Sequence, residues 1–355
     1  EMSAPAWGFG ERDFVVAADG RVAWAVGGTA VIDGVPHGTP AAGFDHWLIA
    51  GSTVTVIARF ADRDASIVSF SLDDPGDMRT VVPGRRLPLE RSDIAAAEPI
   101  EFPTTAGTPA YAWYYPPTNA AVHGPPEQLP PLVAMIHGGP TSDAVPFFSL
   151  AKQFWTSRGF AVVDVNHRGS TGFGREFRDL LDGQWGVVDV EDCCAAAQWL
   201  AASGRVDPAR MVIRGGSAGG FTVLASLANA DVFAAGASYY GVADLSALAA
   251  DTHKFEARYC DRLIGPWPDA RELYEARSPI NHLDGFDRPL IVFQGLDDMV
   301  VPPSQSEMIV AALSEKGIEC EYHAYEGEGH GFRNAENIVA SIAAELEFYR
   351  RVLQL

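Results

Sequence analysis

The strongest constraint on the fold is a regular alternation of short apolar runs and helical segments that begins at about Pro99. Strand-like runs occur at Leu132–Ile136, Ala161–Val165, Met211–Ile213, Ala235–Tyr239, Leu290–Gln294 and Glu319–Ala324. Helical segments are expected at Phe147–Arg158, Val188–Ala202, Ala218–Ala230, Gln305–Lys316 and Ala335–Leu353. Because almost wholly apolar strands separated by helices are typical of a mostly parallel sheet covered on both faces, residues 94–355 are predicted to form an α/β domain.

The residues before Ile94 have a different pattern. Short β-like runs at Phe14–Val16, Val22–Val26, Thr53–Ala58 and Ser66–Ser71 are separated by turn signals such as Asp19-Gly20, Asp33-Gly34 and Pro75-Gly76. Antiparallel strands of this kind could form a small sandwich, or the last one or two blades of a β-propeller. A bare pair of blades leaves sheet edges unpaired, and a start methionine would not follow Glu1. We therefore expect residues 1–93 to be an incomplete propeller remnant whose upstream part has been removed.

Composition excludes several functions. The 355 residues are 47% apolar and carry 26 Lys and Arg against 46 Asp and Glu, a net charge of −20. A field of that sign repels phosphate backbones and anionic lipids, so we expect no nucleic-acid and no membrane partner. No apolar run approaches the ~20 residues of a membrane-spanning helix. Four cysteines and no secretory signal favour a cytoplasmic location, although an absent natural N-terminus leaves secretion open.

A tight glycine turn follows one of the predicted strands. The run Met211–Arg214 leads into Gly215-Gly216-Ser217-Ala218-Gly219-Gly220 and then into an Ala- and Leu-rich helical segment. Strand, G-x-S-x-G turn and helix in this order are the context of a nucleophile elbow, which would expose the Ser217 hydroxyl above the sheet. An ordinary turn or a phosphate loop is also rich in glycine, but neither G-x-G-x-x-G nor Gly-Lys-Ser/Thr follows this strand.

An acid and a base follow the serine in the order Ser…Asp…His that this fold uses. The run Leu290–Gln294 ends in Gly295-Leu296-Asp297-Asp298, and the run ending at Tyr325 leads into Gly329-His330-Gly331. His330 would take the proton of Ser217 as general base, and an aspartate would orient its ring. Each residue alone could be an ordinary loop residue. Position alone does not decide between Asp297 and Asp298.

Two main-chain donors are needed to stabilise the oxyanion of a tetrahedral intermediate. One is expected to be the amide of Ala218, the residue after the nucleophile. The turn His137-Gly138-Gly139-Pro140 after the strand Leu132–Ile136 could supply the other, although it could also be a plain strand exit.

Together, these and other segments resemble the catalytic domain of the prolyl oligopeptidase family of serine peptidases, most closely its acylaminoacyl-peptidase and dipeptidyl-peptidase branches. The resemblance covers about Pro99 to Leu355. It is carried by His137-Gly138-Gly139-Pro140, Asn166-His167-Arg168-Gly169-Ser170-Thr171-Gly172-Phe173-Gly174, Trp185-Gly186-Val187-Val188-Asp189-Val190-Glu191-Asp192, Gly215-Gly216-Ser217-Ala218-Gly219-Gly220, Ser278-Pro279-Ile280-Asn281, Gly295-Leu296-Asp297-Asp298-Met299-Val300-Val301-Pro302 and Gly329-His330-Gly331-Phe332.

The resemblance assigns further roles. The family's acid is the fourth residue of G-x-x-D-x-x-V, which selects Asp298, and the Gly139 amide becomes the second oxyanion donor. The family's propeller limits entry to short peptides, but most of a propeller is missing here. His167 and Ala218 each stand where the family commonly has Tyr. The apolar S1 pocket, transferred by position, would contain the side chains of Val242, Leu245, Val301, Tyr239 and Tyr240, unless these residues simply pack the core.

The sequence therefore predicts an α/β-hydrolase that cleaves short peptides or aminoacyl amides through an acyl-enzyme, as an aminopeptidase-like, acylaminoacyl- or dipeptidyl-peptidase-like exopeptidase. An esterase or amidase for small molecules and a non-catalytic processed fragment are the alternatives. No cofactor is expected, and no metal, because the histidines show no H-E-x-x-H or comparable ligand spacing. An upstream propeller segment as a second chain and a homo-oligomer are the protein partners considered.

Overall fold

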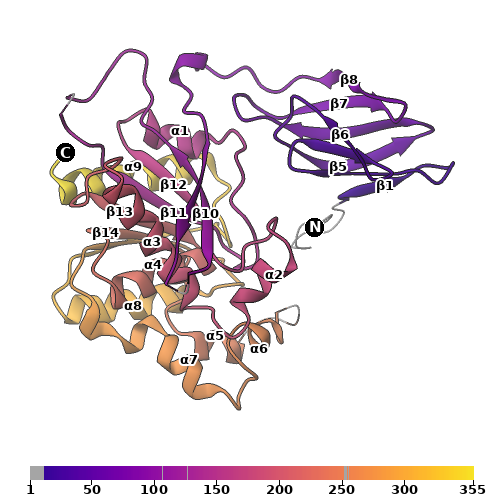
Figure 1. Cartoon of the computed structure of the whole chain (residues 1–355). Coiled ribbons are helices and arrows are strands. Elements are labelled where there is room, and N and C mark those ends of the chain that lie inside the picture. Colours follow the sequence, from indigo (N-terminus) through magenta and orange to yellow (C-terminus); the bar gives the residue numbers. More distant parts are fainter. Residues whose placement is uncertain (1–11, 106, 126, 252–253, 255) are drawn as a thin grey trace.

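The computed structural model describes residues 12–105, 107–125, 127–251, 254 and 256–355. In the order of the chain, two antiparallel sheets precede a larger mixed sheet that is flanked by helices (Figure 1). The first eleven residues of the predicted propeller remnant lie outside the described residues. None of the helices in the described ranges is both long enough and apolar enough to cross a membrane.

The N-terminal region forms two four-stranded antiparallel sheets with strand orders β1-β2-β3-β4 and β5-β6-β7-β8. Apolar residues alternate along their strands, and the buried ones form one cluster around Trp47, which is 1% exposed. Both sheets have their four strands in sequential order, and the antiparallel pairing expected from the sequence is confirmed. The strands are β1 (Phe14–Val16), β2 (Val22–Val26), β3 (Thr29–Ile32), β4 (Val35–Gly38), β5 (Gly43–Ala50), β6 (Thr53–Arg59), β7 (Ser66–Ser71) and β8 (Asp74–Val82).

The C-terminal region is built on one eight-stranded sheet with the order β16-β15-β14-β13-β11-β12-β10-β9. The strands from β11 to β16 run parallel, and β10 and β9 are added antiparallel at one edge. The α/β prediction is confirmed. The strands are β9 (Glu98–Pro103), β10 (Pro109–Tyr115), β11 (Leu132–Ile136), β12 (Ala161–Asn166), β13 (Met211–Gly216), β14 (Ala235–Tyr239), β15 (Leu290–Gly295) and β16 (Cys320–Tyr325).

Helices cover both faces of this sheet, and side chains alternate between them along each strand. Leu132, Ala134 and Ile136 of β11 pack in the cluster that contains α3, α4 and α8, whereas Val133 and Met135 pack in the cluster with α1 and α9. The helices are α1 (Leu150–Thr156), α2 (Arg175–Arg178), α3 (Val188–Ala202), α4 (Ala218–Asn229), α5 (Leu245–Asp251), α6 (Tyr259–Leu263), α7 (Arg271–Arg277), α8 (Pro303–Glu315) and α9 (Ala335–Leu353).

Helix α1 is shorter than the predicted segment Phe147–Arg158. The side chain of Ser149 caps it by accepting a hydrogen bond from the Lys152 amide, so the helix begins only at Leu150. At its C-terminal end the chain turns through Gly159, whose φ of +89° favours glycine. Both deviations come from local capping, which apolar periodicity does not reveal.

Candidate active site

Ser217 lies at a sharp corner between β13 and α4. Its φ of +57° is unusual for a residue with a side chain, and its amide donates to the Tyr239 carbonyl at 2.9 Å. A Cβ at Gly215 would lie 2.5 Å from the Gly219 carbonyl oxygen, and one at Gly219 would lie 2.6 Å from the Ile136 carbonyl oxygen. The glycines on both sides of Ser217 are therefore required by close main-chain contacts, as a nucleophile elbow demands.

His330 connects Ser217 to Asp298. Its Nε2 lies 2.9 Å from Ser217 Oγ, and its Nδ1 lies 2.8 Å from Asp298 Oδ2. Because an ionised carboxylate only accepts hydrogen bonds, Nδ1 carries the proton of the neutral ring and Nε2 accepts from the serine hydroxyl. The three side chains come from loops that follow β13, β15 and β16, so the carboxyl ends of neighbouring parallel strands bring them together.

Of the two candidate acids, the structure places Asp298 at the imidazole. Asp298 is only 2% exposed, and its Oδ1 accepts the amides of Val300 and Val301, both at 2.9 Å. Asp297 is exposed, and its amide donates to the Glu328 carbonyl at 2.9 Å. Position in the sequence did not separate the two residues, whereas the turn gives only Asp298 a buried side chain with fixed partners.

The main-chain amides predicted for the oxyanion lie around the same corner. A Cβ at Gly138 would be 3.4 Å from Ser217 Cβ, so the glycine turn after β11 approaches the serine closely. Gly139 has a φ of +118°, which suits glycine, and a Cβ there would lie 2.7 Å from the Thr141 amide nitrogen. Ala218 is the first residue of α4, and a first-turn amide has no acceptor within its own helix.

Four of the five residues predicted for the substrate pocket, Val242, Leu245, Val301 and Tyr239, are buried. Val242, Leu245 and Val301 are 1–2% exposed and pack in the apolar core on the α3 and α4 side of the sheet. The Tyr239 ring lies on the other face, where its hydroxyl donates to Glu345 of α9 at 2.6 Å. The substrate-lining role of these four side chains stays a prediction.

Tyr240 differs from that group because its ring packs beside His330, with ring centroids 4.8 Å apart. Its hydroxyl and ring edge are the first atoms that a Cβ at Gly216 would meet, at 3.0–3.2 Å. Burial raises the pKa of this phenol, so it stays neutral at physiological pH. Tyr240 therefore contacts both the nucleophile turn and the histidine loop.

Sequence reasoning missed two groups that hold these loops. The Tyr259 hydroxyl accepts from the Thr141 amide at 3.1 Å and donates to Thr141 Oγ1 at 2.7 Å, which connects α6 to the glycine turn. Glu328 accepts hydrogen bonds from the amides of Arg333 and Asn334 at 2.8 and 2.9 Å, and so closes the loop that carries His330. Thr141 and Tyr259 are 118 positions apart in the sequence, so no local signal predicts their contact.

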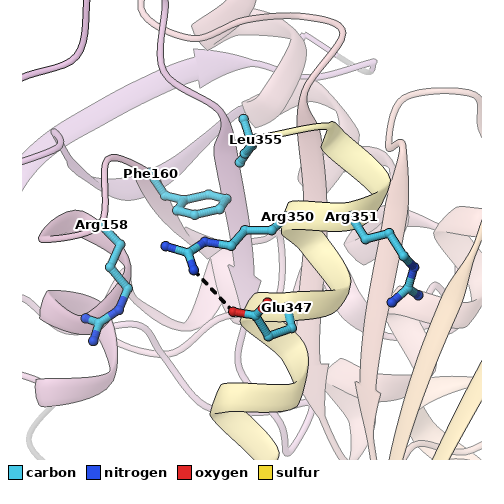
Figure 2. Close-up of a pocket in the computed structure, with 6 residues that line it drawn as sticks. All are labelled: Arg158, Phe160, Glu347, Arg350, Arg351 and Leu355. Carbon is cyan, nitrogen blue, oxygen red and sulfur yellow. Dashed lines mark hydrogen bonds and ion pairs between the residues drawn. The ribbon is translucent and has the colours of Figure 1, made fainter.

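A pocket of about 550 Å³ lies elsewhere, beside the C-terminal turn of α9 (Figure 2). Two of its arginines, Arg350 and Arg351, are in the last turn of α9, where positive charge complements the helix dipole. Arg350 also pairs with Glu347 at 3.2 Å. The basic character of this pocket thus has a structural explanation, and none of the predicted site residues lines it. The lining residues are Arg158, Phe160, Glu347, Arg350, Arg351 and Leu355.

The sheet order, the elbow after β13 and the loops after β15 and β16 define the class of α/β-hydrolases. A profile described as the prolyl oligopeptidase family matches residues 146–355. The chain belongs to the prolyl oligopeptidase family of serine peptidases.

Individual relatives agree with this assignment. The structure of a Mycobacterium tuberculosis puromycin-hydrolyzing peptidase superposes with a TM-score of 0.95 at 39% identity, over 99% of this chain and 55% of that one. A dipeptidyl aminopeptidase BIII from Pseudoxanthomonas mexicana is 30% identical over 80% of this chain and 42% of its own length. An acylamino-acid-releasing enzyme from Arabidopsis thaliana is 32% identical over 56% of this chain and 27% of its own length. The chain thus spans about half the length of these relatives or less.

Proposed function

We propose that this chain is a serine exopeptidase that hydrolyses short peptides or aminoacyl amides through an acyl-enzyme. The observation that carries the proposal is the His330 imidazole, which lies 2.9 Å from Ser217 Oγ and 2.8 Å from Asp298 Oδ2. Both distances are within the reach that proton transfer and ring orientation require.

In the first half of the reaction, Ser217 Oγ attacks the scissile carbonyl while its proton moves to His330 Nε2. Asp298 stays ionised and stabilises the imidazolium. When the tetrahedral intermediate collapses, the C–N bond breaks and His330 gives the proton to the leaving amine. An ester bond now joins the acyl group to Ser217.

In the second half, His330 takes a proton from a water molecule that attacks this ester. The acyl C–O bond to Ser217 then breaks, and the serine oxygen regains its proton from His330. In each tetrahedral intermediate the amides of Gly139 and Ala218 donate to the oxyanion. Donors of this kind contribute most when they are already in place before charge develops.

The names of the relatives support the substrate class. Relatives that cover more than half of this chain are named for releasing acylamino acids, for removing dipeptides and for hydrolysing puromycin, which is itself an aminoacyl amide. The N-terminal sheets support the proposal that residues 1–93 are the end of a propeller that would restrict entry to short substrates.

Steady-state kinetics on two matched substrate series test the proposal. Aminoacyl 4-nitroanilides and acetylated aminoacyl 4-nitroanilides form one series, and short-chain 4-nitrophenyl esters form the other. We expect the parent chain to cleave the anilides with a measurable kcat/KM, and Ser217→Ala to cleave none of them. The ratio of kcat/KM on the free anilides to kcat/KM on the acetylated anilides then gives the type of exopeptidase. Turnover of esters with no detectable anilide cleavage would favour the esterase alternative, and turnover of neither would favour the inert fragment.

A further inference from the structure

We infer that His137 is a positioning residue that fixes the direction of the Gly139 amide. This inference rests on the proposed function, in which that amide donates to the oxyanion. His137 begins the glycine turn after β11, and its imidazole is not among the groups that take part in proton transfer.

The direct evidence is the hydrogen bond between His137 Nδ1 and the Gly138 carbonyl oxygen, at 2.9 Å. A carbonyl oxygen only accepts, so Nδ1 carries the proton. The Gly138 carbonyl and the Gly139 N–H belong to the same planar trans peptide, in which they point in opposite directions. The hydrogen bond holds the Gly138 carbonyl toward the His137 ring, so the Gly139 N–H must point away from that ring.

The other ring nitrogen has a partner that is compatible with this tautomer. Nε2 lies 2.9 Å from the Oγ atom of Ser170, which is fully buried. Since Nδ1 carries the proton, Nε2 accepts from the serine hydroxyl. The His167 ring stacks on His137 with centroids 4.7 Å apart and so fixes the plane of the imidazole.

The ring is also kept neutral. Burial and the neighbouring His167 lower the pKa of His137 to about 3, and burial lowers the pKa of His167 to about 4. A neutral His137 can accept from Ser170 at all pH values near neutrality, whereas an imidazolium could not.

The glycine turn needs such support because glycine residues have little preference for one backbone conformation. Two successive glycines can rotate the peptide between them at low cost, and Gly139 already has a φ of +118°. A rotated peptide would present a carbonyl oxygen to the developing negative charge. On the far side of the turn the Tyr259 hydroxyl accepts from the Thr141 amide at 3.1 Å, so the segment is held at both ends.

Two substitutions of His137 separate the proposed role from simple packing. The amide nitrogen of Asn can occupy the position of Nδ1 and donate to Gly138, whereas the amide of Gln reaches the position of Nε2 and leaves that carbonyl without its donor. Loss of one oxyanion donor typically lowers kcat by about 10²–10³. We expect His137→Asn to keep kcat within about tenfold of the parent and His137→Gln to lower it about 100-fold, with KM changed less than about threefold in both.

Equal kcat values for the two variants, with both folded by thermal unfolding, would overturn the inference. A second measurement does not depend on turnover or on the stability of a variant. In the parent chain labelled with ¹⁵N-histidine, His137 should show a protonated Nδ1 and an unprotonated Nε2, and a protonated Nε2 would overturn the inference as well. Failure of the parent to cleave any anilide or ester would instead count against the proposed function, and the tautomer would still show whether His137 donates to the Gly138 carbonyl.

Discussion

Asp298 orients His330 with one carboxylate oxygen while its other oxygen is held by the protein main chain. Oδ2 accepts from His330 Nδ1 at 2.8 Å, and Oδ1 accepts the amides of Val300 and Val301 at 2.9 Å each. The carboxylate is buried and cannot rotate without losing these partners. The direction of the imidazole is therefore set by the turn after β15.

Replacing this acid should show its role in selecting the tautomer. Asp298→Asn keeps the size of the side chain but can present an N–H toward Nδ1, so we expect kcat to fall by about 10⁴ with little change in KM. The matched control is Asp297→Asn at the exposed neighbouring position, for which we expect a change below about twofold. A similar loss in both variants would show that Asp298 has no special role.

The glycine at position 215 should be required for steric reasons. In Gly215→Ala the new Cβ would lie 2.5 Å from the Gly219 carbonyl oxygen and 2.7 Å from the Ile136 side chain. Such crowding costs about 1–3 kcal/mol, so both the free energy of unfolding and kcat should fall. Gly124→Ala is the control because a Cβ there meets no atom within 4 Å, and we expect a change within about 0.5 kcal/mol by urea denaturation.

A buried ion pair supports the strand that leads into the elbow. Arg214 of β13 and Glu345 of α9 form an ion pair at 2.7 Å, and the Glu345 side chain is fully buried. Glu345→Ala leaves the guanidinium without its partner and should lower the free energy of unfolding by about 3–5 kcal/mol. The exposed pair between Arg351 and Glu319 is the control, and Glu319→Ala should cost about 0–1 kcal/mol. Equal losses in the two variants would contradict this explanation.

The stacked histidines should make the fold sensitive to mild acid. Their pKa values in the folded chain, about 3 for His137 and about 4 for His167, lie below the ordinary value of 6.5. Between pH 6.5 and 4 the unfolded chain therefore binds more protons than the folded chain. The contribution of the two neutral histidines to the free energy of unfolding is fully present above pH 6.5. It is lost as the pH falls, by about 1.4 kcal/mol per pH unit for each histidine.

Urea denaturation at several pH values between 5 and 7 measures this slope. In His167→Asn one of the two depressed groups is gone, so the slope should decrease by about 1.4 kcal/mol per pH unit at the acid end of that range. The slope of the free energy of unfolding against pH is compared because any pH-independent destabilisation by the substitution does not change it. A slope identical to that of the parent would contradict the assignment of a depressed pKa to His167.

The contact between α6 and the glycine turn should affect the rate more than binding. Tyr259→Phe removes the hydroxyl that accepts from the Thr141 amide and donates to its Oγ1, at 3.1 and 2.7 Å. We expect kcat to fall about 3- to 30-fold, the equivalent of one or two net hydrogen bonds. Tyr322→Phe is the matched control, because this buried hydroxyl has no hydrogen-bond partner among the described residues. Activity should not change in the control.

The sequence predicted the parts of the site that lie in contiguous segments of the chain. Strand β13, the elbow and α4 are contiguous, so the glycines around Ser217 already required a tight turn. The Asp297-Asp298 pair and His330 were found because each follows a strand of a parallel sheet, whose ends converge, and the family pattern then selected Asp298. The roles of Tyr259 and Glu328 were not predicted, since the contacts that define them depend on how loops fold onto each other.

The pocket residues illustrate a different limit. The family pattern suggested that Val242, Leu245, Val301, Tyr239 and Tyr240 line a substrate pocket, and the direction of each strand and loop decides which way these side chains point. Tyr239 and Tyr240 are adjacent, yet Tyr239 packs toward α9 and Tyr240 packs against His330. His137 was interpreted only as part of a glycine turn, although its ring makes the contacts that orient that turn.

The most direct test of the central claim is covalent labelling by a fluorophosphonate, followed by mass spectrometry of the peptides. If His330 activates Ser217 as proposed, the parent chain should acquire one phosphonyl adduct on Ser217, and Ser217→Ala should acquire none. A parent chain that remains unlabelled while folded, or an adduct located on another residue, would contradict the account.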